Sequence, residues 1–453
     1  MSLRKWARPR WATAAEPDAD PRVVGRGQVA ERLPALASPV YRRFLVGAFV
    51  GTLGAWMQAT AQGWLVLELT NSPGLLGVTS AVGAAPILFL TLFAGVLADR
   101  VDRRRLLVAT QLAAATLAGI LAFLTMTGLV QFWHVVAIAG LSGAVGALAM
   151  PAFQAIVSTI VDRRAIGNAV ALNSAQFNLG RIVGPSAAGI AIAAGGIALA
   201  FWANAVALLV VALVLATLRM APHADLVRVE ASLWSNLVDG IAYLRRDRVI
   251  RLLVLLAAAP ALFVLNYLVL MPVYARDILG IGAPGLGLLT AGVGIGALSG
   301  ALGVAVLRPS GGSGRLMLAG LVLSSTALIV FAVSRWLPLS LAALAVLGAS
   351  QVAYYTTTST LIQVLVPPRL RGRVSSLYVL TSLGVIPFGN LLAGLVAERF
   401  DPTVALAGGG LATLVVVAWV ALRFPELRRV EARAISARAE SAPASPDPAT
   451  LRR

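Results

Sequence analysis

The sequence contains no cysteine, one lysine and two histidines. The absence of cysteine excludes disulfide bonds and thiolate metal sites. His134 and His223 are too few for a histidine-rich metal site, so we expect neither a bound metal nor a cofactor. The one lysine, Lys5, does not belong to a Gly-x-x-x-x-Gly-Lys-Ser/Thr loop, the element that holds phosphates in ATP-driven pumps. This absence argues against a pump of that kind.

Charge is also scarce, since only 12% of the 453 residues are charged whereas 58% are hydrophobic. Soluble domains carry roughly a quarter charged residues, and a bilayer-spanning helix needs about 20 mostly apolar residues. We therefore predict an all-α polytopic membrane protein with twelve transmembrane helices. The apolar runs that qualify lie at 44–69, 73–98, 106–127, 132–160, 165–192, 196–218, 250–275, 284–307, 315–333, 337–364, 372–397 and 402–423.

The net charge of +18 would ordinarily suggest nucleic-acid binding, but the positions of the charges argue against it. With the N-terminus inside, only Arg276, Arg335 and Arg399 of the 37 Arg and Lys residues fall in outer breaks, and Arg181 lies within a span. This asymmetry follows the positive-inside rule. The charge thus indicates orientation, with attraction to anionic membrane lipids as a second effect. We expect no nucleic-acid partner and two cytoplasmic termini.

The breaks between the apolar runs divide the chain into two sets of six spans. Residues 1–43 lack the apolar core of a signal peptide and are expected to form a cytoplasmic tail. Six-helix bundles are predicted over 44–219 and 250–424. Between them, 220–249 has leucine and isoleucine at helical spacing before a group of arginines, which predicts an amphipathic helix on the cytoplasmic membrane face, with a plain loop as the alternative. Residues 425–453 are rich in Ala, Ser, Pro and Arg and are predicted to be disordered.

The two sets of spans also repeat one another. A shift of 205 positions aligns the fifth run with the eleventh and matches Gly184 with Gly389 and Gly189 with Gly394. A shift of 211 aligns "SPGLLGVTSAVG" of the second run with "APGLGLLTAGVG" of the eighth. Two matched halves are typical of alternating-access transporters, with the substrate site between them.

The break between the second and third runs contains the charged stretch "GVLADRVDRRRLL". Asp99 lies at the C-terminal end of its span, where the helix dipole disfavours a carboxylate, so it needs a cation or a helix N-terminus as partner. We predict that Asp99 forms a charge-paired gate, and the alternative for the arginines is that they only fix topology. The cations nearby and at the start of the eleventh run are Arg100, Arg103, Arg104, Arg105, Arg369, Arg371 and Arg373.

This stretch resembles motif A of the major facilitator superfamily, which reads Gly-x-x-x-Asp-Arg-x-Gly-Arg-Arg/Lys. Asp102 stands in place of the second glycine of the motif, which brings the tightness of the turn into question. The resemblance covers about residues 40–424 and implies two pseudo-symmetric six-helix bundles in one chain, for which we expect a monomer. The matching positions are Gly95, Asp99, Arg100, Arg103 and Arg104.

The stretch "GRIVGPSAAG" of the fifth run resembles the antiporter motif C of the same superfamily. Gly180, Gly184, Pro185 and Gly189 match, and Ala188 replaces one glycine. Small residues every four positions give a smooth helix face, and the proline is expected to bend it. The resemblance implies a segment that packs between the halves and limits leakage in exporters. Ordinary close helix packing is the alternative.

Polar residues at span depth are candidates for a substrate cavity or for coupling. Arg181 lies near mid-span, where a charge costs at least about 2.5–3.5 kcal/mol. We expect it to face the cavity and to pair with Glu68 or with an anionic substrate group; a buried salt bridge or a snorkelling side chain is the alternative. For each uncharged candidate, the alternative is that its side chain only forms a hydrogen bond between helices. These candidates are Gln58, Gln62, Asn173, Gln176, Asn266, Gln351, Tyr354 and Tyr355.

The stretches "MQATAQGWLVLELTNSPGLLG", "ALNSAQFNLGRIVGP" and "MPVYARDILGIGAPGLGLL" together resemble the drug:proton antiporter branch that includes macrolide and enterobactin exporters. Better-known members carry an arginine in span four, which this chain lacks, so the resemblance alone implies proton coupling. We expect a secondary transporter of the cell membrane that exports small amphipathic molecules, such as drugs or siderophore-like compounds, with protons as the coupling ion. A proton-coupled importer and a non-transporting membrane sensor are the alternatives. His134 alone does not form the polar cluster of a membrane enzyme.

Overall fold

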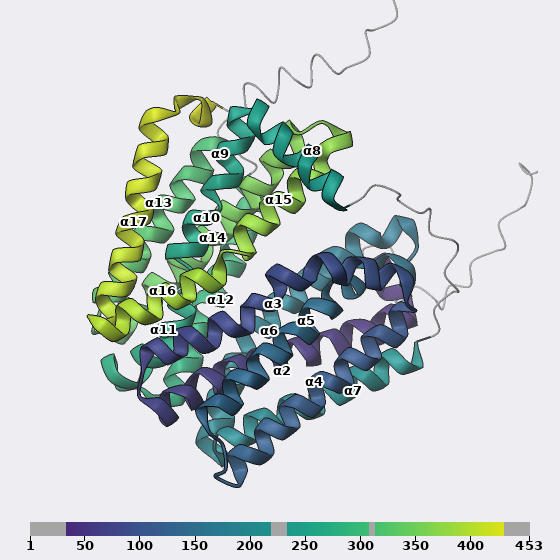
Figure 1. The fold of residues 1–453 in the computed structure, drawn as a ribbon, viewed down its shortest axis with the longest axis vertical. Coiled ribbons are helices and arrows are strands. Elements are labelled where there is room, and N and C mark those ends of the chain that lie inside the picture. The colour runs from purple at the N-terminus through teal and green to yellow at the C-terminus, as the bar shows by residue number, and fades with distance from the viewer. Residues whose placement is uncertain (1–32, 219–232, 308–312, 430–453) are drawn as a thin grey trace, which may run out of the picture.

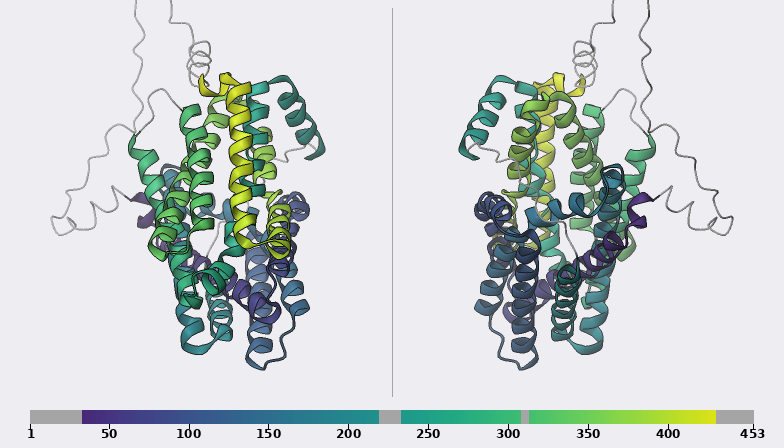
Figure 2. Two further views of the ribbon diagram at one scale, coloured as in Figure 1. Left: turned by 90° about the vertical axis from the view of Figure 1, so that its left-hand side faces the viewer. Right: turned by 90° about the vertical axis from the view of Figure 1, so that its right-hand side faces the viewer.

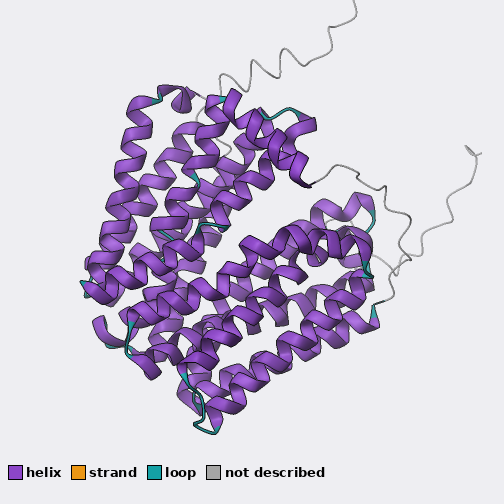
Figure 3. Cartoon of the chain, in the orientation of Figure 1, coloured by secondary structure: helices purple, strands orange, loops and turns teal. Residues whose placement is uncertain are grey.

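The structure is a computed structural model that describes residues 33–218, 233–307 and 313–429. These residues form helices joined by short connections, and they contain no strand (Figure 3). Twelve helical segments among them are long and apolar enough to cross a membrane. The predicted all-α polytopic fold is therefore confirmed.

Each of the first six spans is one uninterrupted helix. They are α2 (Pro39–Thr70), α3 (Pro73–Arg100), α4 (Arg103–Met126), α5 (Phe132–Ile160), α6 (Ile166–Gly195) and α7 (Ile197–Thr217), with single turns of 3-10 helix at η2 (Pro34–Ala37) and η3 (Arg163–Ala165).

The helix α2 begins before the predicted start of the first span. Ser38 caps it, because its hydroxyl accepts a hydrogen bond from the Tyr41 backbone N–H at 3.2 Å, and Pro39 occupies the first turn. Tyr41 is fully buried and donates through its hydroxyl to the Ala169 carbonyl at 2.8 Å. The prediction of a tail over 1–43 was therefore wrong for the residues from Pro34 onward, and residues 1–32 lie outside the described part of the chain.

Spans seven and eleven are broken, which the apolar pattern did not predict. Pro260 and Pro272 lack the N–H that continues a helix, and the side-chain amide of Asn266 donates to the Leu262 carbonyl at 2.6 Å where the ladder is interrupted. Span eleven restarts at Ile386 with a proline in its first turn. The helices of this half are α9 (Arg248–Leu256), α10 (Ala258–Phe263), α11 (Tyr267–Val273), the π-helical turn η4 (Tyr274–Ile278), α12 (Gly282–Leu307), α13 (Ser313–Val333), α14 (Leu337–Leu365), η5 (Pro368–Leu370), α15 (Arg371–Leu383), α16 (Ile386–Arg399) and α17 (Pro402–Arg423).

The connection between the halves includes the helix α8 (Leu233–Arg246), at the place where the sequence predicted an amphipathic helix. It packs on the start of α15, where Gly240 adjoins Leu377, and Figure 2 shows it as a teal helix at the periphery of one end of the molecule. The chain ends its described part in the 3-10 helix η6 (Pro425–Arg429). Because Leu427 of η6 is fully buried, the predicted disorder was wrong for 425–429, and residues 430–453 lie outside the described part.

The two halves meet at one end of the molecule and separate toward the other (Figure 1). We call these the α2–α3 end, where the turn between α2 and α3 lies, and the α8 end. The contacts between halves are made chiefly by two helix pairs, α3 with α16 and α6 with α12. These are spans two with eleven and five with eight, so the two pairs are related by the same shifts that relate the sequence repeats.

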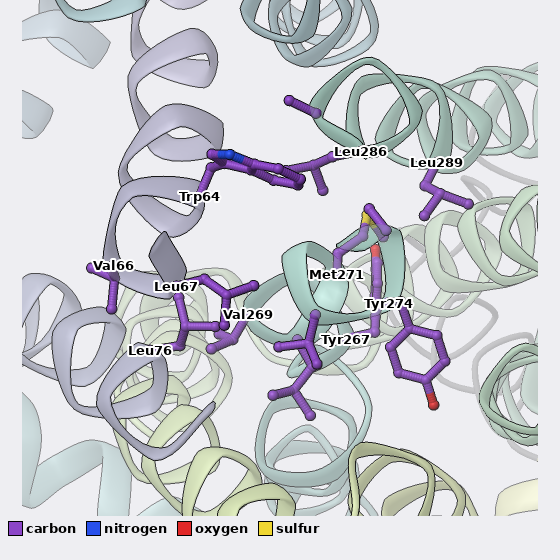
Figure 4. Close-up of a cluster of buried hydrophobic side chains, with 14 of the residues drawn as sticks. Trp64, Val66, Leu67, Leu76, Tyr267, Val269, Met271, Tyr274, Leu286 and Leu289 are labelled. Atoms are coloured by element: carbon purple, nitrogen blue, oxygen red, sulfur yellow. The ribbon is translucent and has the colours of Figure 1, made fainter. Parts of the chain in front are cut away.

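A hydrophobic cluster joins both halves near the α2–α3 end. Figure 4 shows Trp64 and Leu76 of the first half beside Val269, Met271 and Leu286 of the second. All five side chains are buried. Burial of these apolar side chains therefore helps to hold the two halves together near the α2–α3 end.

Candidate functional site

The charged turn that resembles motif A begins the helix α4. Asp102 is the N-cap of this helix, and its carboxylate accepts the Arg105 N–H at 2.8 Å. Its φ is −55°, so the turn does not need the glycine that usually stands there. Aspartate in place of glycine thus loses backbone flexibility and gains an N-cap hydrogen bond, which typically contributes about 1 kcal/mol to helix stability.

The other residues of this motif divide into described and undescribed side chains. Arg103 is the first residue of α4, and the Arg104 guanidinium donates to the Ala216 carbonyl near the C-terminal end of α7, where the helix dipole favours a cation. Gly95, Asp99 and Arg100 lie in α3, but their side chains are outside the described part of the structure. The predicted Asp99 gate remains a prediction.

The arginines at the start of span eleven have partners within their own half. Arg373 Nη1 lies 2.5 Å from Asp239 Oδ2 of α8, and Arg371 Nε donates to the Val366 carbonyl at 3.1 Å. Asp239 was missed as a partner, although it lies in the predicted amphipathic helix. The linker helix thus holds the α8 end of span eleven by an ion pair.

The motif C stretch packs on both halves at once. A β-carbon added to Gly184 would lie 2.6 Å from Trp56 Cβ of α2, and one added to Gly180 would lie 2.7 Å from Thr52 Cγ2. A β-carbon on Gly189 would instead lie 2.7 Å from the Ala283 carbonyl oxygen of α12, across the halves. The helix α6 continues through Pro185. Small residues here are needed for backbone approach on two sides.

The span two–eleven pair shows the same close approach. A β-carbon on Gly394 would lie 2.7 Å from the Gly77 Cα and 2.9 Å from the Pro73 carbonyl oxygen. Gly394 is the repeat partner of Gly189, and Pro73 is the repeat partner of Pro284, whose Cα would lie 2.9 Å from a β-carbon on Gly189. The interface between the halves is therefore two copies of one glycine-mediated contact.

A cavity of about 470 Å³ lies between the halves and contains two of the predicted residues, Gln58 and Gln62. Gln58 accepts a hydrogen bond from Asn204 Nδ2 at 2.5 Å. Asn204 and Asn390 also line this cavity and were missed, although each is a polar residue within an apolar run and the same criterion would have found them. Other lining residues from the two halves include Trp56, Thr79, Ser80, Ser142, Pro272, Leu286 and Thr290.

A second cavity, of about 550 Å³, lies within the first half and contains Asn173 and Gln176. These two side chains are joined by a hydrogen bond from Gln176 Nε2 to Asn173 Oδ1 at 3.1 Å. Trp56 lines both cavities. Four predicted polar side chains are therefore brought to two adjacent cavities that share one indole ring.

The next predicted residue, Arg181, has aromatic neighbours from both halves. Its Cζ lies 5.8 Å from the centroid of the Trp56 ring, and the hydroxyls of Tyr267 and Tyr355 lie near its side chain. Tyr355 meets Tyr354 edge to face, with ring centroids 5.2 Å apart. Asn266, Gln351 and Tyr354 are buried in the second half, and none of this group lines the two cavities described above.

Glu68 lies apart from this group. It is exposed near the α2–α3 end and accepts a hydrogen bond from Trp64 Nε1 at 2.6 Å. The structure does not pair it with Arg181. Of the two partners that the sequence offered for Arg181, the anionic substrate group remains as a prediction. No group of three or more acidic or histidine side chains that could hold a metal ion occurs in the described ranges.

Two charged residues of the second half bind the turn between α2 and α3, which sequence reasoning missed. Arg276 donates to the Leu67 carbonyl at 3.0 Å and to the side chain of Asn71, the left-handed C-cap of α2. Glu398 accepts from the Ser72 hydroxyl at 2.8 Å and from the Gly74 N–H at 3.0 Å. The cation Arg276 thus lies at the C-terminus of α2, and the anion Glu398 lies at the N-terminus of α3. The helix dipole favours both placements.

The profile of the family described as transmembrane secretion effector, MFS_3, matches residues 30–448. The chain belongs to this family of major facilitator transporters. Among its relatives, the multidrug efflux pump Tap of Mycolicibacterium fortuitum is 30% identical over 78% of this chain and 88% of its own. The enterobactin exporter EntS of Shigella flexneri is 25% identical over 86% of this chain and 92% of its own.

Solved structures of major facilitator transporters share the fold. A bacterial homologue of the lysosomal transporter Spinster, solved in an inward-facing unoccupied conformation, aligns with a TM-score of 0.67 and 15% identity over 88% of this chain and 98% of its own. The nucleoside transporter NupG aligns with a TM-score of 0.69 and 12% identity over 85% of this chain and 99% of its own. The family assignment confirms the resemblance drawn from the charged turn and the glycine stretch. Its members are transporters, so the chain is a multi-pass membrane transporter.

Proposed function

We propose that this transporter exports small amphipathic molecules, drug-like or siderophore-like, across the cell membrane by alternating access. The observation that carries the proposal is the cavity of about 470 Å³ whose lining mixes amide and hydroxyl groups with apolar side chains of both halves. Such a lining suits a substrate that is partly polar and partly apolar. The names of the relatives Tap and EntS, a multidrug efflux pump and an exporter, support the outward direction.

The proposed orientation puts the α8 end in the cytoplasm, with both termini there. Its support is the concentration of arginine in the breaks at that end, against only Arg276, Arg335 and Arg399 at the other. In this orientation, the arrangement in Figure 1 is closed to the outside. Reporter fusions after Thr127 and after Arg246 test it, with the first expected outside and the second inside the cell. The opposite result would reverse the proposed direction.

Alternating access requires the contacts at the α2–α3 end to break while the α8 end closes. The helix pairs α3–α16 and α6–α12 are suited to this rocking, because smooth glycine surfaces allow helices to shift with little steric resistance. Asp99 is proposed to stabilise the closed α8 end through charge pairing. A variant with Asp99→Asn is expected to lose most transport while it still inserts in the membrane. Normal transport by that variant would remove this gate from the proposal.

Protons are proposed as the coupling ion on the strength of the family resemblance. No acidic residue is among the described residues that line the two cavities, so a titrating group at either cavity would have to be the substrate itself or a residue that reaches the cavity in another conformation. The transporter is proposed to act as a monomer, because the cavity is lined by one chain, and to contact anionic lipids through its arginine-rich side.

Uptake of neutral and anionic drug-like dyes into everted membrane vesicles tests the proposed direction and coupling. An acidic vesicle interior is expected to drive accumulation, and collapse of the gradient with a protonophore is expected to abolish it. Vesicles from cells without the transporter serve as the control for passive leakage. Accumulation in right-side-out vesicles under an outside-acid gradient would instead support the importer, and a failure to move any of a panel of drug-like dyes would favour the non-transporting sensor.

A further inference from the structure

Arg181 and several tyrosines of the second half carry buried polar atoms that have no hydrogen bond of good geometry within the described part of the chain. An unsatisfied buried polar group typically costs about 1–3 kcal/mol, so native proteins rarely leave several together without water or a ligand to meet them. Tyr267 and Tyr354 are 0% and 1% exposed, and Gln351 is 5% exposed. Among the described residues, the buried atoms of this group without a hydrogen bond of good geometry are Arg181 Nε, Gln351 Nε2 and the hydroxyls of Tyr267, Tyr354, Tyr355 and Tyr378, although the Tyr267 hydroxyl lies within reach of the Arg181 side chain.

Arg181 and the tyrosines form one cluster. Arg181 lies near the hydroxyls of Tyr267 and Tyr355, and the ring of Tyr355 meets that of Tyr354 edge to face with centroids 5.2 Å apart. Tyr378 lies near both of these rings. Arg181 comes from α6 in the first half, whereas the tyrosines come from α11, α14 and α15 in the second. The cluster therefore joins the halves at the depth where a transported molecule must be held.

The polar groups of this cluster can all donate hydrogen bonds. A guanidinium carries only donors, the free Gln351 nitrogen is a donor, and each tyrosine hydroxyl has a proton to give. No described acid lies at this depth: Glu68 is near the α2–α3 end, and Asp239 pairs with Arg373 at the α8 end. The Arg181 charge is thus left without a described carboxylate partner, which favours an anionic ligand.

We propose that Arg181, Tyr267 and Tyr355 recognise a carboxylate or phenolate oxygen of the substrate, whose aromatic or apolar body rests against Trp56. The centroid of the Trp56 ring lies 5.8 Å from the Arg181 Cζ, and Trp56 also lines both cavities. A charged group bound at Arg181 would therefore leave the rest of the molecule in the cavity space. This inference rests on the proposed transport function and adds the substrate class to it.

Saturation-transfer NMR on the purified full-length protein in detergent micelles tests the inference. The probe is salicylate, with 2-hydroxybenzyl alcohol as its neutral analogue and benzylammonium as a cation of similar size. Salicylate is expected to bind at least about tenfold more tightly than either, as the loss of a charge-assisted hydrogen bond implies. Equal binding of the three probes, or no salicylate binding, would overturn the proposal.

Variants assign the binding to the cluster. Arg181→Gln is expected to weaken salicylate binding by about tenfold or more. Tyr355→Phe keeps the aromatic ring and leaves the charge of Arg181 in place, and it is expected to weaken binding by about threefold to tenfold. Arg164→Gln removes an exposed arginine and is expected to leave binding unchanged. Unchanged binding in both Arg181→Gln and Tyr355→Phe would overturn the assignment. The binding assay does not depend on a proton gradient or on the direction of transport. If salicylate binds as expected but vesicle transport fails, the result counts against the proposed export function and leaves the binding site standing.

Discussion

The two ends of the molecule use charged side chains in opposite ways. At the α2–α3 end, Arg276 and Glu398 of the second half bind helix termini of the first half. At the α8 end, Arg104, Arg371 and Arg373 bind groups of their own half. One end thus holds the halves together, whereas these charges at the other end only stabilise each half separately. A transporter whose halves rock against each other needs contacts between the halves that break at one end while new contacts form at the other.

The closed end also depends on backbone contact. The pairs Gly189–Pro284 and Gly394–Pro73 are repeat-related and bring the halves close enough to exclude a methyl group. These contacts are short and involve backbone atoms, which cannot rotate away from an added methyl group, whereas the ionic contacts to the α2–α3 turn involve side chains at the surface. We therefore expect glycine substitutions to disturb the closed end more than charge substitutions do.

The largest effect is expected for Gly77→Ala. A β-carbon there would lie 2.7 Å from the Asn390 carbonyl oxygen and 2.9 Å from the Gly394 Cα, so the halves must separate at the α2–α3 end. Overpacking of this kind costs about 1–3 kcal/mol. Since the chain has no native cysteine, a cysteine introduced by Ala59→Cys in the cavity reports opening through its reaction with an external maleimide. We expect the rate to rise about tenfold.

Gly408→Ala is the matched control, because nothing lies within 4 Å of a β-carbon at Gly408 of α17. It should leave the labelling rate of the same cysteine unchanged. Equal rates for Gly77→Ala and Gly408→Ala would contradict the role given to close backbone contact at the α2–α3 end.

A smaller increase in external labelling is expected for Arg276→Gln. The variant loses the contacts to the Leu67 carbonyl and to Asn71. Because Arg276 is only partly buried and Asp277 shares its charge at 2.6 Å, we assign the cross-half contact about 1 kcal/mol, or roughly a fivefold shift in population. Arg335→Gln, which removes an arginine at the same end bonded to Thr403 within its own half, should have no such effect. A rise of equal size in both variants would contradict the assignment.

A still smaller effect is expected at the α8 end. Arg373→Gln and Asp239→Asn each break the ion pair between α15 and α8. Since the side chains are 31% and 50% exposed, the pair is expected to contribute less than about 1 kcal/mol to stability. A double-mutant cycle on thermal unfolding measures this coupling. External labelling should not change, and a change as large as that of Arg276→Gln would show that both ends hold the halves together in this conformation.

The smallest effect concerns pH at the α2–α3 end. A hydrogen bond from the Thr403 hydroxyl holds the pKa of Asp401 below its ordinary value, assisted by the Thr403 N–H at 2.6 Å and by the charge of Arg335. A carboxylate with a lowered pKa adds stability that is complete above its unfolded pKa of about 3.9 and is lost as the pH falls through the folded value. Asp401→Asn should therefore flatten the acid side of the stability profile below about pH 4. An unchanged profile would contradict the prediction.

The sequence predicted the membrane fold because the bilayer fixes the length and polarity of every span. The same reasoning found Gln58, Gln62, Asn173 and Gln176, since a polar group in an apolar run is costly without a cavity or a partner. The breaks in spans seven and eleven escaped prediction. Their prolines were visible, but prolines also lie inside the unbroken helices α3, α5 and α6, so a proline in an apolar run does not by itself locate a break.

The contacts at the α2–α3 end could not be predicted from the sequence for a different reason. Arg276 and Asn71 are 205 positions apart, and Glu398 and Ser72 are 326 apart. Nothing local marks these residues, because arginine and glutamate at a membrane surface are ordinary.

The most direct test of the account is a reversible cross-link across the closed end. Ser72→Cys and Glu398→Cys place the protein's only two thiols at the contact that joins the halves, where the native Oγ and Oε2 atoms are 2.8 Å apart. A bifunctional methanethiosulfonate should abolish substrate efflux from cells, and a reducing agent should restore it, while either single variant treated in the same way keeps its activity. Full efflux by the cross-linked protein would contradict the claim that the halves separate at the α2–α3 end during each transport cycle.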